Sequence, residues 1–236
     1  MKIHFIIHES FESPGAIEVW AKNKNHQISF TRVYLYEKYP ETLENIEMLI
    51  VMGGPQSPET TLEECPYFNA EAELGFIRKV IDADKKVLGV CLGAQMIGEA
   101  FGAKVEHSPN KEIGIFDILL TEEAKGDSFF STLPEKFSSA HWHGDMPGLT
   151  AEAKVLAFSE GCPRQIMQYA PKIYGFQCHL EFTNNSIKTM IESGGEEITQ
   201  NIGLPYVQTS EELLNYNYSE MNGILFRFLD YFEGKI

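Results

Sequence analysis

The chain has 236 residues, a formal net charge of −15 at pH 7 and a hydrophobic content of 43%. This length suffices to bury a large core, and one large α/β domain or two small ones would fit it. The strong negative charge excludes a protein that binds nucleic acid by neutralising its phosphates. The apolar run near the N-terminus is too short for a signal peptide, and no run approaches the roughly 20 residues of a membrane span. We therefore expect a cytoplasmic protein with neither nucleic acid nor a membrane as a partner.

The first half of the chain alternates strand-like and helix-like segments. Short apolar runs with β-branched or aromatic residues predict strands at 2–7, 26–35, within 46–55 and at 86–90. Helical spacing of apolar residues predicts helices at 15–24, 66–84 and 92–101. Strands that alternate with helices at this spacing are typical of an open, mostly parallel sheet covered by helices on both faces.

The second half of the chain has a different pattern of predicted elements. Short strand-like runs separated by turns follow residue 103 and indicate an antiparallel extension of the same sheet, at 103–107, 112–120, 153–160, 164–170 and 172–182. The pattern becomes helical from residue 184. No repeat or clear linker interrupts the chain, so we expect a single domain over 1–236 with a helical C-terminal extension over 183–236.

The four cysteines are Cys65, Cys91, Cys162 and Cys178, and their spacing contains no CxxC pair. In a cytosolic chain they are expected to be free thiols. Cys91 stands apart, because Gly89 and Gly93 flank it in the pattern G-x-C-x-G between a predicted strand and a predicted helix. Such a turn presents a nucleophile at the C-terminal edge of a sheet, and the start of the following helix favours the thiolate. A buried, unreactive cysteine is the alternative.

A thiolate nucleophile needs a base, and the base needs a group that orients it. The apolar run at 172–182 ends with His179 and Glu181. In a strand these two residues share a face about 6.5 Å apart, so the glutamate could hold the imidazole. The order nucleophile, histidine, acid differs from that of α/β-hydrolases. Gly53 and Gly54 follow the strand within 46–55, where backbone N–H groups together with that of Leu92 could form an oxyanion hole.

These pieces together resemble the class I glutamine amidotransferase domain of the triad type, which has a flavodoxin-like fold. The matching segments are "MGGP" at 52–55, "GVCLGAQ" at 89–95, "HWHGD" at 141–145 and "CHLEF" at 178–182. The segment at 141–145 is similar to that of the amidotransferase domain of GMP synthase and its stand-alone relatives. Leu180 departs from the proline that is usual between the histidine and the glutamate, and Ala94 stands where a larger residue is common.

The resemblance implies a role for each matching residue. Cys91 would be the nucleophile, His179 the general base and Glu181 its orienting partner. Gly54 and Leu92 would donate the oxyanion N–H groups. Gly53 and Gln95 would contact the substrate, and Asp145 would meet the ammonium group of free glutamine. No cofactor and no metal are implied. A zinc site built from His141, His143, Cys162 and Cys178 is the competing interpretation, although its spacing matches no common closed site.

The resemblance implies hydrolysis of the γ-glutamyl amide of glutamine through a cysteine thioester, with release of ammonia and glutamate. The sequence contains no phosphate-binding loop of the G-x-x-x-x-G-K-[ST] type and no ATP-activating domain after residue 182. Ammonia would therefore pass to a separate synthetase subunit. A stand-alone hydrolase of γ-glutamyl peptides and a non-catalytic binding relative are the alternatives. The sequence also leaves open whether the protein forms a homodimer. The polar, Gly-rich segment 193–210 is expected to lie over the mouth of the site and to limit which donors enter.

Overall fold

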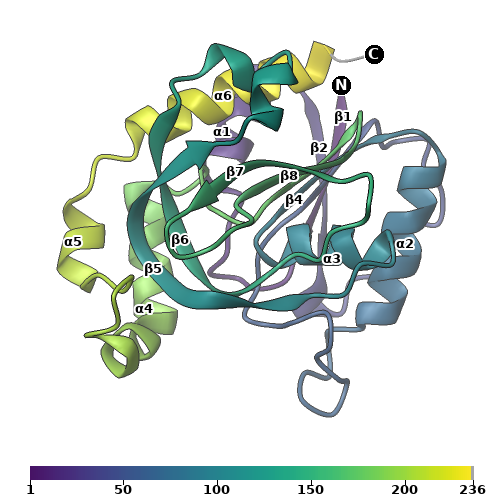
Figure 1. Cartoon of the computed structure of the whole chain (residues 1–236). Helices are drawn as coiled ribbons and strands as arrows, with labels where there is room; N and C mark the ends of the chain where they lie inside the picture. Colours follow the sequence, from purple (N-terminus) through teal and green to yellow (C-terminus); the bar gives the residue numbers. More distant parts are fainter. Residues whose placement is uncertain (235–236) are drawn as a thin grey trace.

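A computed structural model of the chain describes residues 1–234. Within them, one mixed sheet contains nine strands in the order β2-β1-β3-β4-β9-β8-β7-β5-β6. The bounds of the strands are β1 Lys2–Ile7, β2 Gln27–Arg32, β3 Met48–Val51, β4 Lys86–Val90, β5 Glu106–Leu120, β6 Lys136–Met146, β7 Lys154–Ser159, β8 Ile166–Ala170 and β9 Ile173–Phe176. The predicted class, an open α/β sheet with helices on both faces and an antiparallel extension, is confirmed (Figure 1).

The parallel part of the sheet consists of β2, β1, β3, β4 and β9. Its inner strands are mostly apolar: β3, for example, reads MLIV and all four of its residues are buried. Strands buried on both faces have this composition because helices cover each side. The carboxyl ends of parallel strands meet at one edge of a sheet, which is where open α/β folds place their ligands.

The sheet is covered by six α-helices within the described residues. Their bounds are α1 Gly15–Asn23, α2 Ala70–Asp82, α3 Leu92–Ala100, α4 Asn184–Asn201, α5 Ser210–Asn215 and α6 Ser219–Gly234. One hydrophobic cluster joins α1, α4 and α6 to one face of the sheet, and the other joins α2 and α3 to the opposite face. None of the helices in this described part of the chain is long and apolar enough to cross a membrane.

The antiparallel part continues the sheet from β9 through β8, β7, β5 and β6. The two short runs expected at 103–107 and 112–120 form a single long strand, β5, whose pairing with β6 shifts register between His107 and Glu112. Such an irregularity bends a strand and redirects its side chains. Figure 1 shows β5 and β6 as a curved ribbon beside α4.

Some predicted boundaries were wrong. Helix α2 begins at Ala70 rather than at Pro66, because the side chain of Asn69 caps it by accepting a hydrogen bond from the Ala72 N–H. Helix α4 continues to Asn201, so the first half of the segment 193–210 is helical. The rest of that segment lies against β5, where the Ile113 N–H donates to Tyr206 and the Gln208 N–H donates back to Ile113. Of the C-terminal extension predicted over 183–236, the last two residues lie outside the described part.

Candidate active site

Cys91 occupies the sharp turn between β4 and α3. Its backbone has φ 52° and ψ −111°, a conformation that side-chain-bearing residues rarely adopt. A Cβ atom on Gly89 would collide with the Gly93 carbonyl, and one on Gly93 would collide with the Val51 carbonyl. The turn therefore needs both glycines. Strain of this kind costs about 1–3 kcal/mol and is typical of functional positions.

His179 and Glu181 lie beyond the strand that was expected to carry them, because β9 ends at Phe176. His179 is held instead by β6, through two backbone hydrogen bonds with Ala140 of 2.8 and 3.1 Å. The expected contact forms nevertheless: His179 Nδ1 lies 2.6 Å from Glu181 Oε1, and both residues are 2% exposed. The carbonyl of Glu181 accepts the Ala16 N–H at 2.8 Å, which ties the pair to the start of α1.

The remaining ring nitrogen of His179, Nε2, is buried and has no hydrogen-bond partner within residues 1–234. Burial alone would lower the pKa of His179, but the neighbouring Glu181 carboxylate and Cys91 raise it well above its ordinary value. The ring is fixed by stacking on Phe182, with a centroid distance of 4.2 Å. A histidine oriented by a carboxylate, with its other nitrogen free beside a cysteine, can exchange a proton with the sulfur.

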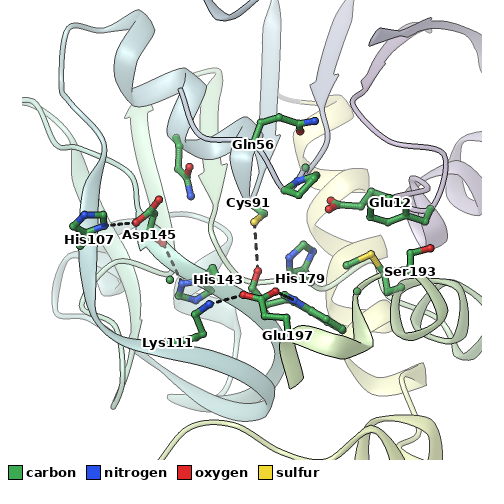
Figure 2. Close-up of a pocket in the computed structure, with 18 residues that line it drawn as sticks. Glu12, Gln56, Cys91, His107, Lys111, His143, Asp145, His179, Ser193 and Glu197 are labelled. Atoms are coloured by element: carbon green, nitrogen blue, oxygen red, sulfur yellow. Dashed lines mark hydrogen bonds and ion pairs between the residues drawn. The ribbon is translucent and has the colours of Figure 1, made fainter. Parts of the chain in front are cut away.

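A cavity of about 510 Å³ opens at this edge of the sheet. Cys91 and His179 both line it, and Figure 2 shows their side chains near its centre. The sulfur lies 3.8 Å from the Trp142 carbonyl and 3.4 Å from Nε2 of Gln177. The sequence did not single out Gln177.

Gly53 and Gly54 lie against the turn that carries Cys91. A Cβ on Gly53 would lie 3.4 Å from the Cβ of Cys91, and a Cβ on Gly54 would lie 2.9 Å from the side chain of Leu92. The structure thus brings together the two peptide segments that were predicted to form an oxyanion hole. Gly54 lines the cavity, whereas Gly53 is buried behind it.

A buried chain of hydrogen bonds fixes the Gly53–Gly54 peptide. The Gly53 carbonyl accepts from Nδ1 of His8 at 2.9 Å, and Nε2 of the same ring donates to Glu73 at 3.0 Å. The Tyr39 hydroxyl donates to the other oxygen of Glu73 at 2.8 Å. Burial would lower the pKa of His8, but the charge and hydrogen bond of Glu73 raise it. Nothing in the sequence had marked His8, Glu73 or Tyr39, because they are far apart along the chain.

Gln95 and Asp145, the other expected substrate contacts, both line the cavity. Gln95 Nε2 donates to Gln177 Oε1 at 3.1 Å, so it supports the residue that contacts the sulfur. Asp145 Oδ1 lies 2.6 Å from Nδ1 of the exposed His107. That hydrogen bond and the charge of Asp145 raise the pKa of His107. Asp145 therefore already has a partner at the rim of the cavity.

Glu12 is a cavity residue that the sequence analysis missed. It lies in the loop after β1, and its carboxylate lies against Gly53 on the side of Cys91. Burial raises its pKa to about 7, opposed by the nearby His179 and His8. The signal in the sequence was only its place after a predicted strand of the parallel sheet, where loops carry ligand contacts.

The two histidines of the alternative zinc site are buried beside Glu112 rather than beside the two cysteines. His143 Nε2 lies 3.2 Å and His141 Nδ1 3.5 Å from Glu112 Oε2. Within residues 1–234 these three side chains form the group with metal-ligand proximity, and Cys162 and Cys178 do not belong to it. The zinc set considered from the sequence is therefore not assembled. Burial lowers the pKa of His141 to about 3 and raises the pKa of the Cys162 and Cys178 thiols.

Helix α4 forms another wall of the cavity. Ser193, Gly194 and Glu197 line it. Glu197 receives a 2.7 Å hydrogen bond from Trp142 Nε1 and forms a 2.5 Å ion pair with Lys111. The segment 193–210 thus approaches the site with its helical half, whereas the part after Asn201 contributes no lining residue.

The fold and this arrangement define a class of protein: an open α/β sheet with a cysteine at a strand-to-helix elbow beside a histidine–carboxylate pair. The profile of the family described as glutamine amidotransferase class-I matches residues 6–195. The chain belongs to the class I glutamine amidotransferase family.

Individual relatives agree with this assignment. The glutamine amidotransferase-like protein YfeJ of Salmonella typhimurium is 47% identical over 230 residues, which are 98% of this chain and 96% of YfeJ. The crystal structure of SMU.1228c is 50% identical, with a TM-score of 0.96 over 99% of this chain and 100% of that chain. The glutamine-hydrolysing GMP synthase of Borreliella burgdorferi is 32% identical over 148 residues, 62% of this chain but 27% of that enzyme. The chain is thus similar to the amidotransferase part of GMP synthase.

Proposed function

We propose that the protein hydrolyses the γ-glutamyl amide of glutamine through a thioester on Cys91, releasing ammonia and glutamate. The observation that carries the proposal is the placement of the Cys91 sulfur and the unpartnered Nε2 of His179 in one cavity, with Glu181 orienting the histidine. His179 takes the thiol proton and later gives it to the leaving nitrogen. Glu181 stabilises the imidazolium that forms in between.

The carbonyl oxygen of the substrate becomes negatively charged when the sulfur attacks. The N–H groups of Gly54 and Leu92 are the donors that we assign to this oxygen, in support of which both peptides lie beside Cys91. Gln95 and Asp145, which both line the cavity, would bind the amino-acid end of the substrate. Figure 2 shows Asp145 on the side of Cys91 away from Glu12, where its charge favours an ammonium group.

The released ammonia would serve a separate synthetase. The similarity to GMP synthase supports this part of the proposal, because that relative is named as glutamine-hydrolysing. A stand-alone γ-glutamyl hydrolase is the second candidate. The observation that favours it is the size of the cavity, about 510 Å³, which extends past His179 toward Glu12 and Ser193. A non-catalytic role is disfavoured because a strained cysteine turn is costly to maintain for binding alone.

The test is to incubate the purified protein with glutamine and to measure glutamate and ammonia together. We expect equal amounts of both products, and no product from the Cys91→Ala variant. Asparagine serves as a control donor that is one methylene shorter. Hydrolysis that persists in Cys91→Ala, or that fails with glutamine and with every other γ-glutamyl amide, would contradict the proposal.

A further inference from the structure

The cavity has two ends, and Cys91 lies between them. Figure 2 shows Asp145, His107 and Lys111 on one side of the sulfur, and His179, Glu12 and Ser193 on the other. Phe11 and Met190 also line the cavity, and they belong to this end because Phe11 precedes Glu12 in the chain and Met190 lies one helical turn before Ser193 in α4. This end therefore combines a carboxylate with apolar side chains, and the lysine of the cavity is at the other end.

The proposed function, on which this inference rests, fixes what lies at each end. His179 must hand its proton to the leaving nitrogen, so the leaving group has to lie on the side of His179. Glutamine releases ammonia, which is a single heavy atom. A leaving group of this size would not fill the end of the cavity that reaches past His179 to Glu12 and Ser193. A larger leaving amine would occupy that space.

Glu12 determines which leaving amine suits this end. Within residues 1–234 its carboxylate forms no hydrogen bond and no ion pair. The charged groups nearest to it are His179, His8, Glu181 and Glu9. Above pH 7, where it is ionised, this half-buried carboxylate is a poor neighbour for a second carboxylate and a good one for a cation. A leaving group that carries a carboxylate, as an amino acid does, finds no lysine or arginine among the described residues at this end, because Lys111 lies at the other end and His179 is already bound to Glu181.

We infer that Glu12 binds a positively charged group on the leaving amine, so that the preferred donors are γ-glutamyl amides of diamines rather than γ-glutamyl peptides. The Cys91 sulfur forms a bond to the carbonyl carbon of the γ-glutamyl amide, the C–N bond of that amide breaks, and the proton of His179 goes to the nitrogen of the departing diamine. Water then attacks the thioester while His179 takes its proton. Glutamate and the free thiol are the products of this second step.

The experiment compares four donors on the wild-type protein at pH 8, where Glu12 is ionised. They are glutamine, the γ-glutamyl amide of a linear four-carbon diamine, the pentyl amide of matching length without charge, and the γ-glutamyl derivative of an ω-amino acid. We expect the value of kcat/KM for the diamine donor to exceed that for the pentyl amide by about tenfold or more, as one charge-assisted hydrogen bond predicts. The ω-amino acid derivative should be the poorest of the three substituted donors.

Two variants assign the preference to Glu12. In Glu12→Gln the ratio of kcat/KM between the diamine and pentyl donors should fall close to one. In the control Glu63→Gln, which removes an exposed charge outside the cavity lining, the ratio should stay as in the wild type.

Three results would overturn the inference. One is a wild-type protein without preference for the diamine donor, a measurement that needs no variant. Another is an equal loss of kcat/KM for the diamine and pentyl donors in Glu12→Gln, which would mean that Glu12 supports the structure of the site as a whole. If no donor is hydrolysed at all, the proposed function fails and the inference fails with it, whereas hydrolysis without cation preference defeats the inference alone.

Discussion

At the scale of single residues, the site depends on three side chains that are brought together from different segments. Cys91 is placed by a strained turn, His179 by pairing with Ala140, and Glu181 by its carbonyl contact with Ala16. The backbone positions of the three residues therefore do not depend on one another's side chains, although the Glu181 carboxylate orients the His179 ring. Removing one side chain should therefore leave the backbone of the site in place, which makes the coupling between the residues measurable.

The first prediction concerns that coupling. We expect Cys91→Ala and His179→Ala each to lower kcat for glutamine hydrolysis by about a thousandfold or more, and the double variant to lose little beyond either one, because residues that act in one step are non-additive. Glu181→Gln should lose less, since it orients the base without exchanging a proton. Losses that multiply in the double variant would show that the residues do not share a step.

Glu12 gives a prediction about stability and pH. Its pKa is raised by burial to about 7, so between the unfolded value near 4.5 and pH 7 the native state holds a proton that the unfolded state has lost. The carboxyl group therefore costs stability progressively as the pH rises through this window. We expect Glu12→Gln to be more stable than the wild type by about 1–2 kcal/mol at pH 8, after allowance for partial exposure to solvent, and equally stable near pH 4.

Denaturant unfolding at both pH values checks this, with Glu63→Gln as the exposed control. The charged groups that face Glu12 are His179, His8, Glu181 and Glu9, so variants at those residues should not be combined with it. A stability difference that is the same at both pH values would contradict the assigned cause.

At the scale of elements, strand β1 and helix α2 together orient the Gly53–Gly54 peptide. His8 follows β1, Glu73 is in α2, and both are fully buried. No cis peptide occurs within residues 1–234, so the Gly54 N–H points away from the Gly53 carbonyl that His8 holds. A fixed carbonyl therefore fixes the direction of the proposed oxyanion donor.

The variant Glu73→Gln tests this role. Loss of the charge lowers the tendency of His8 to donate, so we expect kcat for glutamine to fall about tenfold to a hundredfold, less than the loss of an oxyanion donor itself. The value of KM should change by less than about threefold, because the substrate's amino-acid end is bound elsewhere. Steady-state kinetics separates the two parameters.

Alkylation of Cys91 by iodoacetamide supplies the control, because that reaction develops no oxyanion. Its rate should stay within about twofold of the wild-type rate. An equal fall of alkylation and hydrolysis would mean that Glu73 supports the whole turn. Tyr39→Phe, which removes one donor to Glu73, should give a smaller change in the same direction.

Helix α4 closes the cavity through Glu197, which binds Trp142 of β6 and Lys111 of β5. Glu197→Ala removes both contacts, and we expect the protein to accept bulkier γ-glutamyl donors with a relative gain in kcat/KM of about threefold or more. The rate at which iodoacetamide alkylates Cys91 should stay as in the wild type. Unchanged donor preference would assign specificity to the part of the cavity lined by Gln95 and Asp145 instead.

At the scale of the whole molecule, the fold could be predicted because the parallel strands are short apolar runs that alternate with amphipathic helices. The boundaries of the helices and strands could be predicted less well from the sequence. The start of α2 depends on the Asn69 cap, and the continuity of β5 depends on pairing with β6 across an irregular stretch. Both are decided by contacts that the apolar periodicity does not encode.

The candidate site was predictable where its residues lie in short segments, as with Cys91 and its two glycines, or His179 and Glu181. It was not predictable where partners come from distant segments. Only the order of the strands and the packing of α2 bring Glu12, His8 and Glu73 to the site. The assumed strand geometry at 179–181 was wrong, yet the 2.6 Å contact forms because a glutamate side chain can reach the ring from a loop as well.

The central claim is that Cys91 carries the γ-glutamyl group. The most direct measurement is to mix the protein with glutamine, quench with acid within the first turnover and locate the adduct by mass spectrometry of the intact chain and its peptides. We expect one γ-glutamyl group, on the peptide that contains Cys91, and its loss on incubation before the quench. Release of glutamate and ammonia without that adduct, or an adduct on Cys65, Cys162 or Cys178, would contradict the account.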